Sequence, residues 1–478
     1  MTKKLFVVGV AAAALLASCG GSTSTTSSAA SSIATSTATT SETTSTATSS
    51  SEASSSSAAT SSSNEDSRPD KPDGSSSTSE ATSEASSESS EEASSSASEA
   101  SSSEATSTST IDNISSGSAS VSFVYGNQTT TKTISAAYLI DGVDVTITSG
   151  TYASASSSAD QVVFLVINGG SLTITGTSSS YVSITKSGSA ASNGQVGDDY
   201  NFYGINSGIV VSGSGSSATI SYANISTTSN GSNAVVATNG GSVNITNSTI
   251  TTSGSAGSRG LHTTYDGAIT ADNVSISTQG ASCASLANDR GGGTINASNM
   301  TLETNSNGSP LVYSTDYIKV TDSTGTANSA QAVVVEGGSS AYLDGCNFTC
   351  SGDGNRSGTS DSSSSSHVID AGGVFIYQSV SGDSEEGTDY FHAYDTTIKV
   401  TTSGVPMFYL TNITAEITLD GNTFTQASSS DYFLMAEATD QWGTSGSNGA
   451  TVTVTADFAQ STVSTYVGST SSISWTVS

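Results

Sequence analysis

From about residue 111 onward, apolar positions recur in a fixed pattern: a second follows the first after two residues, and a third after seven. In the uninterrupted middle of the chain this unit restarts after 25, 26, 26, 23 and 23 residues. A spacing of two places both residues on one face of a strand, and the longer step marks a turn. Short strands every 20-odd residues, without a helical period, predict a parallel β-helix. Complete units are Val145, Ile147, Tyr152; Ala218, Ile220, Ile225; Val243, Ile245, Ile250; Ile269, Ala271, Ile276; Ile295, Ala297, Leu302; Ala341, Leu343, Phe348; Phe391, Ala393, Ile398; and Ile417, Leu419, Phe424.

A second column of the repeat consists of turn residues. Asn247, Asn273 and Asn299 are 26 residues apart, and Asp322 and Asp395 take the same place in later units. Asparagine tolerates left-handed backbone geometry, and stacked amides can form hydrogen bonds from coil to coil. The column resembles the asparagine ladders of pectate-lyase-like right-handed β-helices.

These patterns together predict an all-β, single-stranded, right-handed parallel β-helix of about eleven coils. At about 4.8 Å per coil, such a solenoid is roughly 50 Å long. Unusually long units around 186–203, 351–367 and 380–390 are expected as loops that leave the solenoid.

Several short sequence motifs within the coils resemble those of a known family. They are Asn288-Asp289-Arg290-Gly291-Gly292-Gly293, Ser309-Pro310-Leu311-Val312-Tyr313-Ser314, Ile376-Tyr377-Gln378-Ser379 and Trp442-Gly443-Thr444-Ser445-Gly446-Ser447-Asn448-Gly449. Over roughly 118–478 the chain resembles adhesin-like β-helix surface lipoproteins of anaerobic gut bacteria. That family has no established activity, so the resemblance implies location and shape only. A more distant resemblance is to β-helix modules that bind cellulose and pectin with calcium, but their repeated Asp-Asp-Gly-Ile phrases are absent.

The first residues predict export. Lys3 and Lys4 precede twelve largely apolar residues, a pattern typical of a secretory signal and too short for a membrane-spanning helix of about 20 residues. The run ends in Leu-Ala-Ser-Cys-Gly, which resembles the lipobox of bacterial lipoproteins. The resemblance implies cleavage after residue 18 and acylation of Cys19, so that the membrane is contacted through the lipid alone. An ordinary signal peptide is the alternative.

Residues 19–110 consist almost entirely of Ser, Thr, Ala and Glu. Such a segment cannot bury enough apolar surface to offset the entropy lost on ordering. We therefore expect a disordered stalk, with the folded domain at 111–478. The expected location is the bacterial cell surface, with the β-helix outside the cell.

The composition limits the classes of partner that suit the chain and the ways in which its cysteines can pair. The formal net charge is −30, and only 11 residues are Lys or Arg, which argues against nucleic acid and anionic lipid headgroups as partners. A polysaccharide or a host or matrix glycan remains compatible. Apart from Cys19, the cysteines are Cys283, Cys346 and Cys350, an odd number that rules out complete internal pairing. We expect these three to be small buried residues.

Candidate catalytic residues come from acidic positions just before successive core strands. These are Asp266, Asp289, Asp316 and Glu336, with Arg290 next to the column. β-Helix enzymes that act on acidic polysaccharides use such carboxylates as acid–base groups or calcium ligands. The weak catalytic candidates are therefore Asp289, Arg290 and Glu336. The simpler interpretation is that each acid is a turn residue that accepts backbone hydrogen bonds.

The acidic segment Asp383, Glu385, Glu386 and Asp389 is a weak candidate metal site, and calcium is the cofactor to expect there. A solvated loop is the simpler interpretation. Part of an EF-hand loop at 353–361 lacks the required glutamate at its twelfth position, which is Ser364.

Aromatic residues near strand–turn junctions could stack on sugar rings or inside the solenoid. They are Tyr313, Tyr317, Tyr377, Tyr409, Tyr432 and Trp442. The leading hypothesis is a non-catalytic, adhesin-like or glycan-binding surface protein. The alternatives are a polysaccharide lyase or glycoside hydrolase acting through the carboxylate column, and a structural surface-layer component. The fold does not choose between them.

Overall fold

The structure is a computed structural model that describes residues 107–190, 197–379, 382, 384–443 and 448–478. These residues belong to one compact unit, Ser98–Ser478. The expected signal, Cys19 and all but the last four residues of the expected stalk lie outside them. Those four residues form strand β1 (Ser107–Thr110), so the solenoid begins slightly earlier than predicted. Within the described residues, no helix has the length and apolarity needed to cross a membrane.

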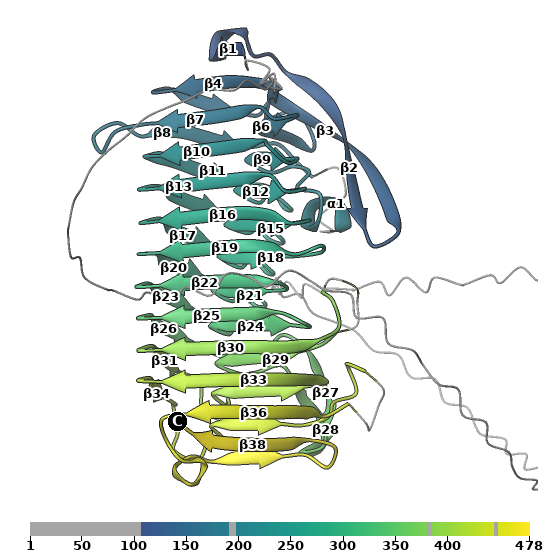
Figure 1. Cartoon of the computed structure of the whole chain (residues 1–478), viewed down its shortest axis with the longest axis vertical. Coiled ribbons are helices and arrows are strands. Elements are labelled where there is room, and N and C mark those ends of the chain that lie inside the picture. Colours follow the sequence, from purple (N-terminus) through teal and green to yellow (C-terminus); the bar gives the residue numbers. More distant parts are fainter. Residues whose placement is uncertain (1–106, 191–196, 380–381, 383, 444–447) are drawn as a thin grey trace, which may run out of the picture. The chain divides into compact units, whose positions relative to one another are not determined.

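The described chain is a parallel β-helix, as the repeat predicted (Figure 1). Three long sheets, here named A, B and C, wind around one core. Sheet A contains β1, β4 (Val143–Ile147), β7 (Ser171–Thr175), β10 (Ser217–Ser221), β13 (Ser242–Thr246), β16 (Gly267–Asp272), β19 (Gly293–Ser298), β22 (Tyr317–Thr321), β25 (Ser340–Asp344), β30 (Thr388–Tyr394), β33 (Ile413–Asp420), β36 (Ala450–Ala456) and β38 (Ser472–Val477).

Sheet B precedes sheet A in each coil. It contains β2 (Gly117–Tyr125), β3 (Gln128–Asp141), β6 (Gln161–Ile167), β9 (Ile209–Ser212), β12 (Val235–Thr238), β15 (Leu261–Thr264), β18 (Leu286–Asn288), β21 (Val312–Ser314), β24 (Val333–Glu336), β29 (Val374–Tyr377), β32 (Phe408–Thr411), β35 (Leu434–Ala436) and β37 (Thr465–Val467). Of its 13 strands, only β2 pairs antiparallel, with β3; the other twelve mark twelve coils, close to the predicted eleven.

Sheet C closes the first ten of the twelve coils. It contains β5 (Thr151–Ala153), β8 (Val182–Lys186), β11 (Ala223–Thr227), β14 (Thr249–Thr252), β17 (Ser275–Thr278), β20 (Thr301–Thr304), β23 (Thr324–Ala327), β26 (Asn347–Cys350), β31 (Thr397–Val400) and β34 (Thr423–Thr425). The chain winds with the expected right-handed sense (Figure 1). The short helices are η1 (Ile111–Asn113), α1 (Asp198–Asn201) and η2 (Gln460–Thr462).

The predicted apolar positions form the core. The first two positions of each unit face inward from sheet A, and the third faces inward from sheet C. The third position of one middle unit is Gly325, which pairs with Leu302 on one side and Phe348 on the other. A Cβ there would lie 2.6 Å from a methyl carbon of Leu311, so the side chain of Leu311, which directly precedes β21 in the same coil, fills the space. The unit of Ile318 and Val320 therefore has a glycine in place of its third apolar residue.

The turn between sheets A and C contains the predicted asparagine column. Asn247, Asn273 and Asn299 have φ of 49°, 53° and 54°, and Asp322 and Asp395 have φ of 50° and 45°. The left-handed conformation is therefore confirmed, as expected for residues that tolerate it. The amide ladder is only partial: Asn273 Nδ2 donates to Asn247 Oδ1 at 2.7 Å, whereas Asn299 Nδ2 donates to a carboxylate of the preceding coil.

Hydroxyl and thiol groups form a buried ladder beside the turn into sheet B. The backbone N–H of Ser232 donates to Ser258 Oγ, that of Ser258 to Cys283 Sγ, and that of Cys283 to Ser309 Oγ, at 2.9 to 3.1 Å. Each side chain satisfies a backbone donor of the preceding coil, which buried N–H groups require. All three described cysteines are buried and free, as predicted, and Cys283 takes a serine's place in this ladder.

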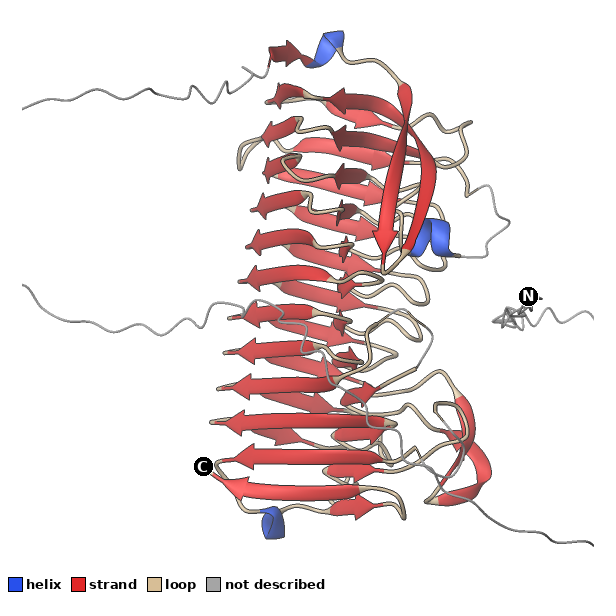
Figure 2. Ribbon diagram, turned by 45° about the vertical axis from the view of Figure 1, so that its right-hand side comes forward, coloured by secondary structure: helices blue, strands red, loops and turns tan. Residues whose placement is uncertain are grey.

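The long units cover the outward face of sheet B at two places (Figure 2). Near the N-terminal end, the β2–β3 hairpin and the 187–208 segment with α1 bury an apolar cluster, the N-terminal cap. Near the C-terminal end, the antiparallel hairpin β27 (Ser357–Ser360) and β28 (Ser363–Val368) and Trp442 build the C-terminal cap. The predicted excursions at 186–203 and 351–367 are these caps.

Candidate functional site on the outer face of sheet B

Strands β15, β18 and β21 carry polar and charged groups on their outward face, between the two caps. The described residues contain three arginines, Arg259, Arg290 and Arg356. Arg259 and Arg290 lie at the ends of strands in this segment, and Arg356 reaches it from the C-terminal cap. Guanidinium groups are thus concentrated in one place on a strongly acidic chain.

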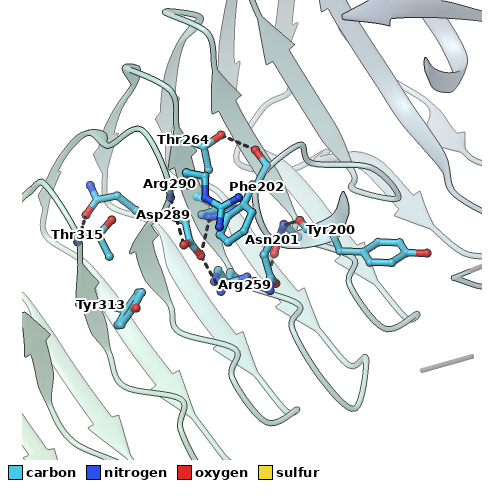
Figure 3. Close-up of polar contacts among 12 residues, drawn as sticks. Tyr200, Asn201, Phe202, Arg259, Thr264, Asp289, Arg290, Tyr313 and Thr315 are labelled. Atoms are coloured by element: carbon cyan, nitrogen blue, oxygen red, sulfur yellow. Dashed lines mark hydrogen bonds and ion pairs between the residues drawn. The ribbon is translucent and has the colours of Figure 1, made fainter. Parts of the chain in front are cut away.

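Arg259 and Asp289 form a buried ion pair at the centre of this face (Figure 3). The Nη2–Oδ2 distance is 2.9 Å, and the side chains are 9% and 5% exposed. Arg259 Nη1 also donates to Asn201 Oδ1 at 2.8 Å, which ties the end of α1 to the coil. Because two charges are buried here, each depends on the other to offset its lost hydration. Asp289, a catalytic candidate from sequence, therefore has a partner that the sequence analysis missed.

His262 lies on the same outward face, in the neighbouring row with Ala287 and Tyr313, and its ring is fully buried. Burial, and secondarily the charge of Arg259, holds the pKa of His262 well below its usual value. Its Nε2 is 3.9 Å from Asp289 Oδ2, too far for a hydrogen bond. Neither ring nitrogen has a hydrogen-bond partner among the described residues. The imidazole is therefore neutral at physiological pH and adds no charge to the ion pair.

The side-chain contacts of Arg290 are with residues of two long connecting segments, not with Glu336, the second candidate acid. Its guanidinium carbon is 3.9 Å from the centroid of the Phe202 ring (Figure 3). Its Nη1 is 3.5 Å from Asp198 Oδ2. Its Nε donates to the carbonyl of Gly382 at 3.2 Å. The side chain thus links α1 and Phe202 to Gly382.

Glu336 is the second buried acid of this face and is 1% exposed. Its Oε2 accepts hydrogen bonds from the hydroxyls of Tyr313 and, at 2.6 Å, Tyr377, and its Oε1 accepts one from Ser379. Burial, and then the charge of Glu336, raises the pKa of Tyr377 well above its usual value, so the phenol remains a donor. Both carboxylate oxygens are engaged by donors of the protein itself.

The carboxylate column expected from the sequence forms only in part. Continuing the register of β18, β21 and β24 places Asp289, Thr315 and Glu336 in one outward row. Two coil steps separate the acids, about 10 Å. Asp266 and Asp316 instead lie at the turn into sheet A, where Asp316 Oδ2 accepts the N–H of Gly293 at 2.9 Å. The acids therefore do not form one continuous edge.

A cavity of about 160 Å³ opens beside Glu336, between the ion pair and the C-terminal cap. Arg259, Arg356 and Asp370 line it together with aromatic residues. Both Asp370 oxygens accept backbone N–H groups, from Asn355 and Arg356, at 3.1 Å. The aromatic lining residues are Tyr313, Phe375 and Tyr377.

Arg356 is the least engaged of the three arginines. Its guanidinium carbon is 5.8 Å from the centroid of the Trp442 ring, a cation–π contact that orients it. No carboxylate among the described residues forms an ion pair with it. A half-buried guanidinium with this environment is suited to receive an anionic group of a ligand.

The acidic segment proposed as a metal site does not converge on one point in the described residues. Asp389 is fully buried, and its Oδ1 accepts the N–H of Ser339 at 3.0 Å, whereas Glu385 and Glu386 are exposed. Asp383 lies outside the described residues. In the part of the chain that the structure describes, no group of three or more His, Cys, Asp or Glu is placed to hold a metal ion. The partial EF-hand residues belong to the β27–β28 excursion, where Asp361 accepts the N–H of Ser469.

A second cavity of about 530 Å³ lies between β2 and the turns that follow β6, β9 and β12. Its lining consists mainly of serine, glycine and asparagine, and Asp266 is its one charged residue. It therefore offers a solvated groove without the paired charges of the first cavity.

Four of the six aromatic candidates, Tyr313, Tyr377, Tyr409 and Trp442, lie together at or beside the first cavity. Tyr409 donates to Glu437 at 2.8 Å, which occupies its hydroxyl. The sequence analysis missed Arg259, Arg356 and Asp370. The scarcity of arginine was the signal available: residues 111–478 contain only three arginines, and an arginine that is buried needs a partner.

The comparisons with known proteins add no identity. None of the protein-family models, curated proteins or solved structures compared with the chain matches it.

Proposed function

We propose that this chain is a bacterial cell-surface lipoprotein whose β-helix binds a glycan without transforming it, in the manner of an adhesin, and that the cavity beside Glu336 takes an acidic sugar unit. The observation that carries the proposal is Arg356, which lines this cavity together with aromatic residues and forms no ion pair with a carboxylate among the described residues. Guanidinium groups pair with carboxylates in planar geometry, and rings stack on sugar C–H faces.

The size of the cavity fits one part of a polymer. Its 160 Å³ is below the range of roughly 300–1,000 Å³ typical of drug-sized ligand sites. A single sugar unit or its carboxylate therefore enters, while the rest of the chain lies on the surface. On a protein of net charge −30, a polyanion is repelled except where positive charge is concentrated.

Binding is favoured over catalysis by the state of the candidate acids. Asp289 is paired with Arg259, and Glu336 accepts three hydroxyl groups, so neither has a free oxygen directed at a ligand. A lyase or hydrolase needs an acid–base group within reach of the sugar.

The test uses residues 20–478, produced without the expected signal and anchor, on polygalacturonate. We expect retention of the protein without release of new sugar ends. Arg356→Gln should weaken binding by about tenfold or more, the loss of about 1.4 kcal/mol. The matched control is Lys399→Gln, which removes one positive charge from an exposed site on sheet C and should leave binding unchanged.

Release of sugar ends by the wild-type protein would make the chain an enzyme. Equal losses for both variants would mean that net charge, not the cavity, governs retention.

The anchor is tested separately. Cys19→Ser should abolish incorporation of radiolabelled palmitate and release the chain from the membrane fraction, because several acyl chains are needed for stable anchoring. Unchanged membrane association would show that an ordinary signal peptide, or another anchor, operates.

A further inference from the structure

The outward face of sheet A carries a cluster of rings on β25 and β30, here named the aromatic platform: Tyr342, Tyr390, His392 and Tyr394. Tyr390, His392 and Tyr394 alternate with the inward residues Phe391 and Ala393, so all three point outward. Tyr342 on β25 pairs directly with His392.

The rings are arranged in an ordered row. Centroids of Tyr390 and His392 are 6.4 Å apart with planes within 4°, and those of His392 and Tyr394 are 6.5 Å apart with planes within 7°. Tyr342 adds a fourth ring, 5.2 Å from Tyr394. Lys319 Nζ, one coil earlier, is 4.6 Å from the centroid of Tyr342. Three rings therefore run in line along one strand, with a fourth beside them.

This arrangement differs from the rest of the same face. The row that contains Tyr342 and His392 is threonine or asparagine in the four coils from β10 to β19 and threonine again after His392. Solvent-facing strand positions need no aromatic residue, and Tyr390 is 37% exposed. In the described residues both caps cover sheet B, so neither of them covers β25 and β30.

The surroundings of the platform select the class of ligand. Asp344 pairs with Tyr394 in the register, and Glu416 and Asp420 follow on the next strand, opposite Tyr390 and Tyr394. These carboxylates repel a polyanion. Next to the platform in the register lie mainly hydroxyl and charged side chains, with one further ring, Tyr317, so a lipid or an apolar protein surface meets mostly polar groups around the rings.

The protonation state of His392 also favours an uncharged ligand. Burial lowers the pKa of His392, so its ring is neutral at physiological pH. Neutral rings offer faces to C–H groups, and the flanking carboxylates accept hydrogen bonds from hydroxyls.

We propose that the aromatic platform is a second binding site, which takes an extended, uncharged polysaccharide segment with sugar rings lying on Tyr342, Tyr390 and Tyr394. The straight row along β30 requires a straight ligand that spans several sugar units. The platform is on a different sheet from the cavity beside Glu336, so the two sites can be tested independently.

The experiment measures binding of cellohexaose, a straight neutral oligosaccharide, to residues 20–478 by calorimetry, with maltohexaose as the curved counterpart. Tyr390→Thr introduces the residue common in the neighbouring rows and should weaken cellohexaose binding at least tenfold. Tyr390→Phe, which keeps the ring, should bind within about twofold of wild type. The matched control is Tyr432→Thr, because Tyr432 is 39% exposed and lies beside sheet B, where its ring centroid is 5.7 Å from that of Tyr466 on β37.

Arg356→Gln should leave cellohexaose binding unchanged, which separates this site from the cavity. The proposal is overturned if wild-type protein does not bind cellohexaose, if maltohexaose binds equally well, or if Tyr432→Thr weakens binding as much as Tyr390→Thr. Melting curves of each variant identify any loss of binding that follows from unfolding. If Tyr390→Thr does not fold, Tyr394→Thr serves as the second variant with the same expected loss.

Discussion

The outward faces of sheets A and B belong to the same coils and have opposite characters. Sheet B is covered at both ends and holds the buried charges Arg259, Asp289 and Glu336 between its caps. Sheet A has no cap in the described residues and presents rings and carboxylates to solvent. Both faces have the same regular strand pairing, so the backbone does not account for the difference.

The lengths of the connections between the sheets account for the difference between the two faces. From β10 onward, one or two residues connect sheet A to sheet C in each coil, because the left-handed column makes the turn. Connections from sheet C to sheet B range up to the long segments that hold α1 and the β27–β28 hairpin. Excursions can fold back only next to where they leave the coil. Long insertions therefore cover charged residues on the outward face of sheet B. Among the described residues, the outward face of sheet A carries only the side chains of its own strands.

The largest effect on stability is expected when the buried ion pair between Arg259 and Asp289 is broken. Asp289→Ala leaves Arg259 buried without its carboxylate, and removal of one partner of such a pair costs about 3–5 kcal/mol. The double variant Arg259→Met, Asp289→Leu should recover most of this loss, because it removes both charges. Chemical denaturation of the three proteins measures the difference. A single variant that loses less than about 1 kcal/mol would show that the pair is hydrated like a surface pair.

A smaller effect, dependent on pH, is expected at Asp389. Burial, and secondarily Glu336, raises the pKa of Asp389 well above its usual value. The unfolded carboxyl ionises near pH 4, so stability present below that pH is lost as pH rises toward the folded pKa. Asp389→Asn, neutral throughout, should melt at a higher temperature than wild type at pH 8, and the difference should shrink at pH 4. A variant that is less stable at pH 8 would contradict this protonation state.

The smallest effect on stability is expected at the platform. Cross-strand aromatic pairs contribute roughly 0.2–1 kcal/mol. Tyr342→Thr should therefore lower the free energy of unfolding by no more than about 1 kcal/mol, as measured by denaturation. A loss as large as that of Asp289→Ala would mean that the rings support the fold, and the contrast between the two faces would fail.

Local sequence determined the scaffold. The spacing of apolar residues predicted the coils, the inward rows and the parallel sheets, because strand periodicity and burial are set by residues near each other in the chain. The column from Asn247 to Asp395 predicted the left-handed turn, since few residue types adopt it. Burial of Cys283, Cys346 and Cys350 was likewise predictable.

Only the tertiary structure decided the candidate sites. Arg259 and Asp289 are 30 residues apart, and Arg356 reaches the cavity from an excursion whose path no periodicity describes. The platform needed the register that places Tyr342 opposite His392 across a 50-residue separation containing two excursions. Local patterns specify which side of a strand a residue occupies, but which excursion folds over which face depends on side-chain packing between distant segments.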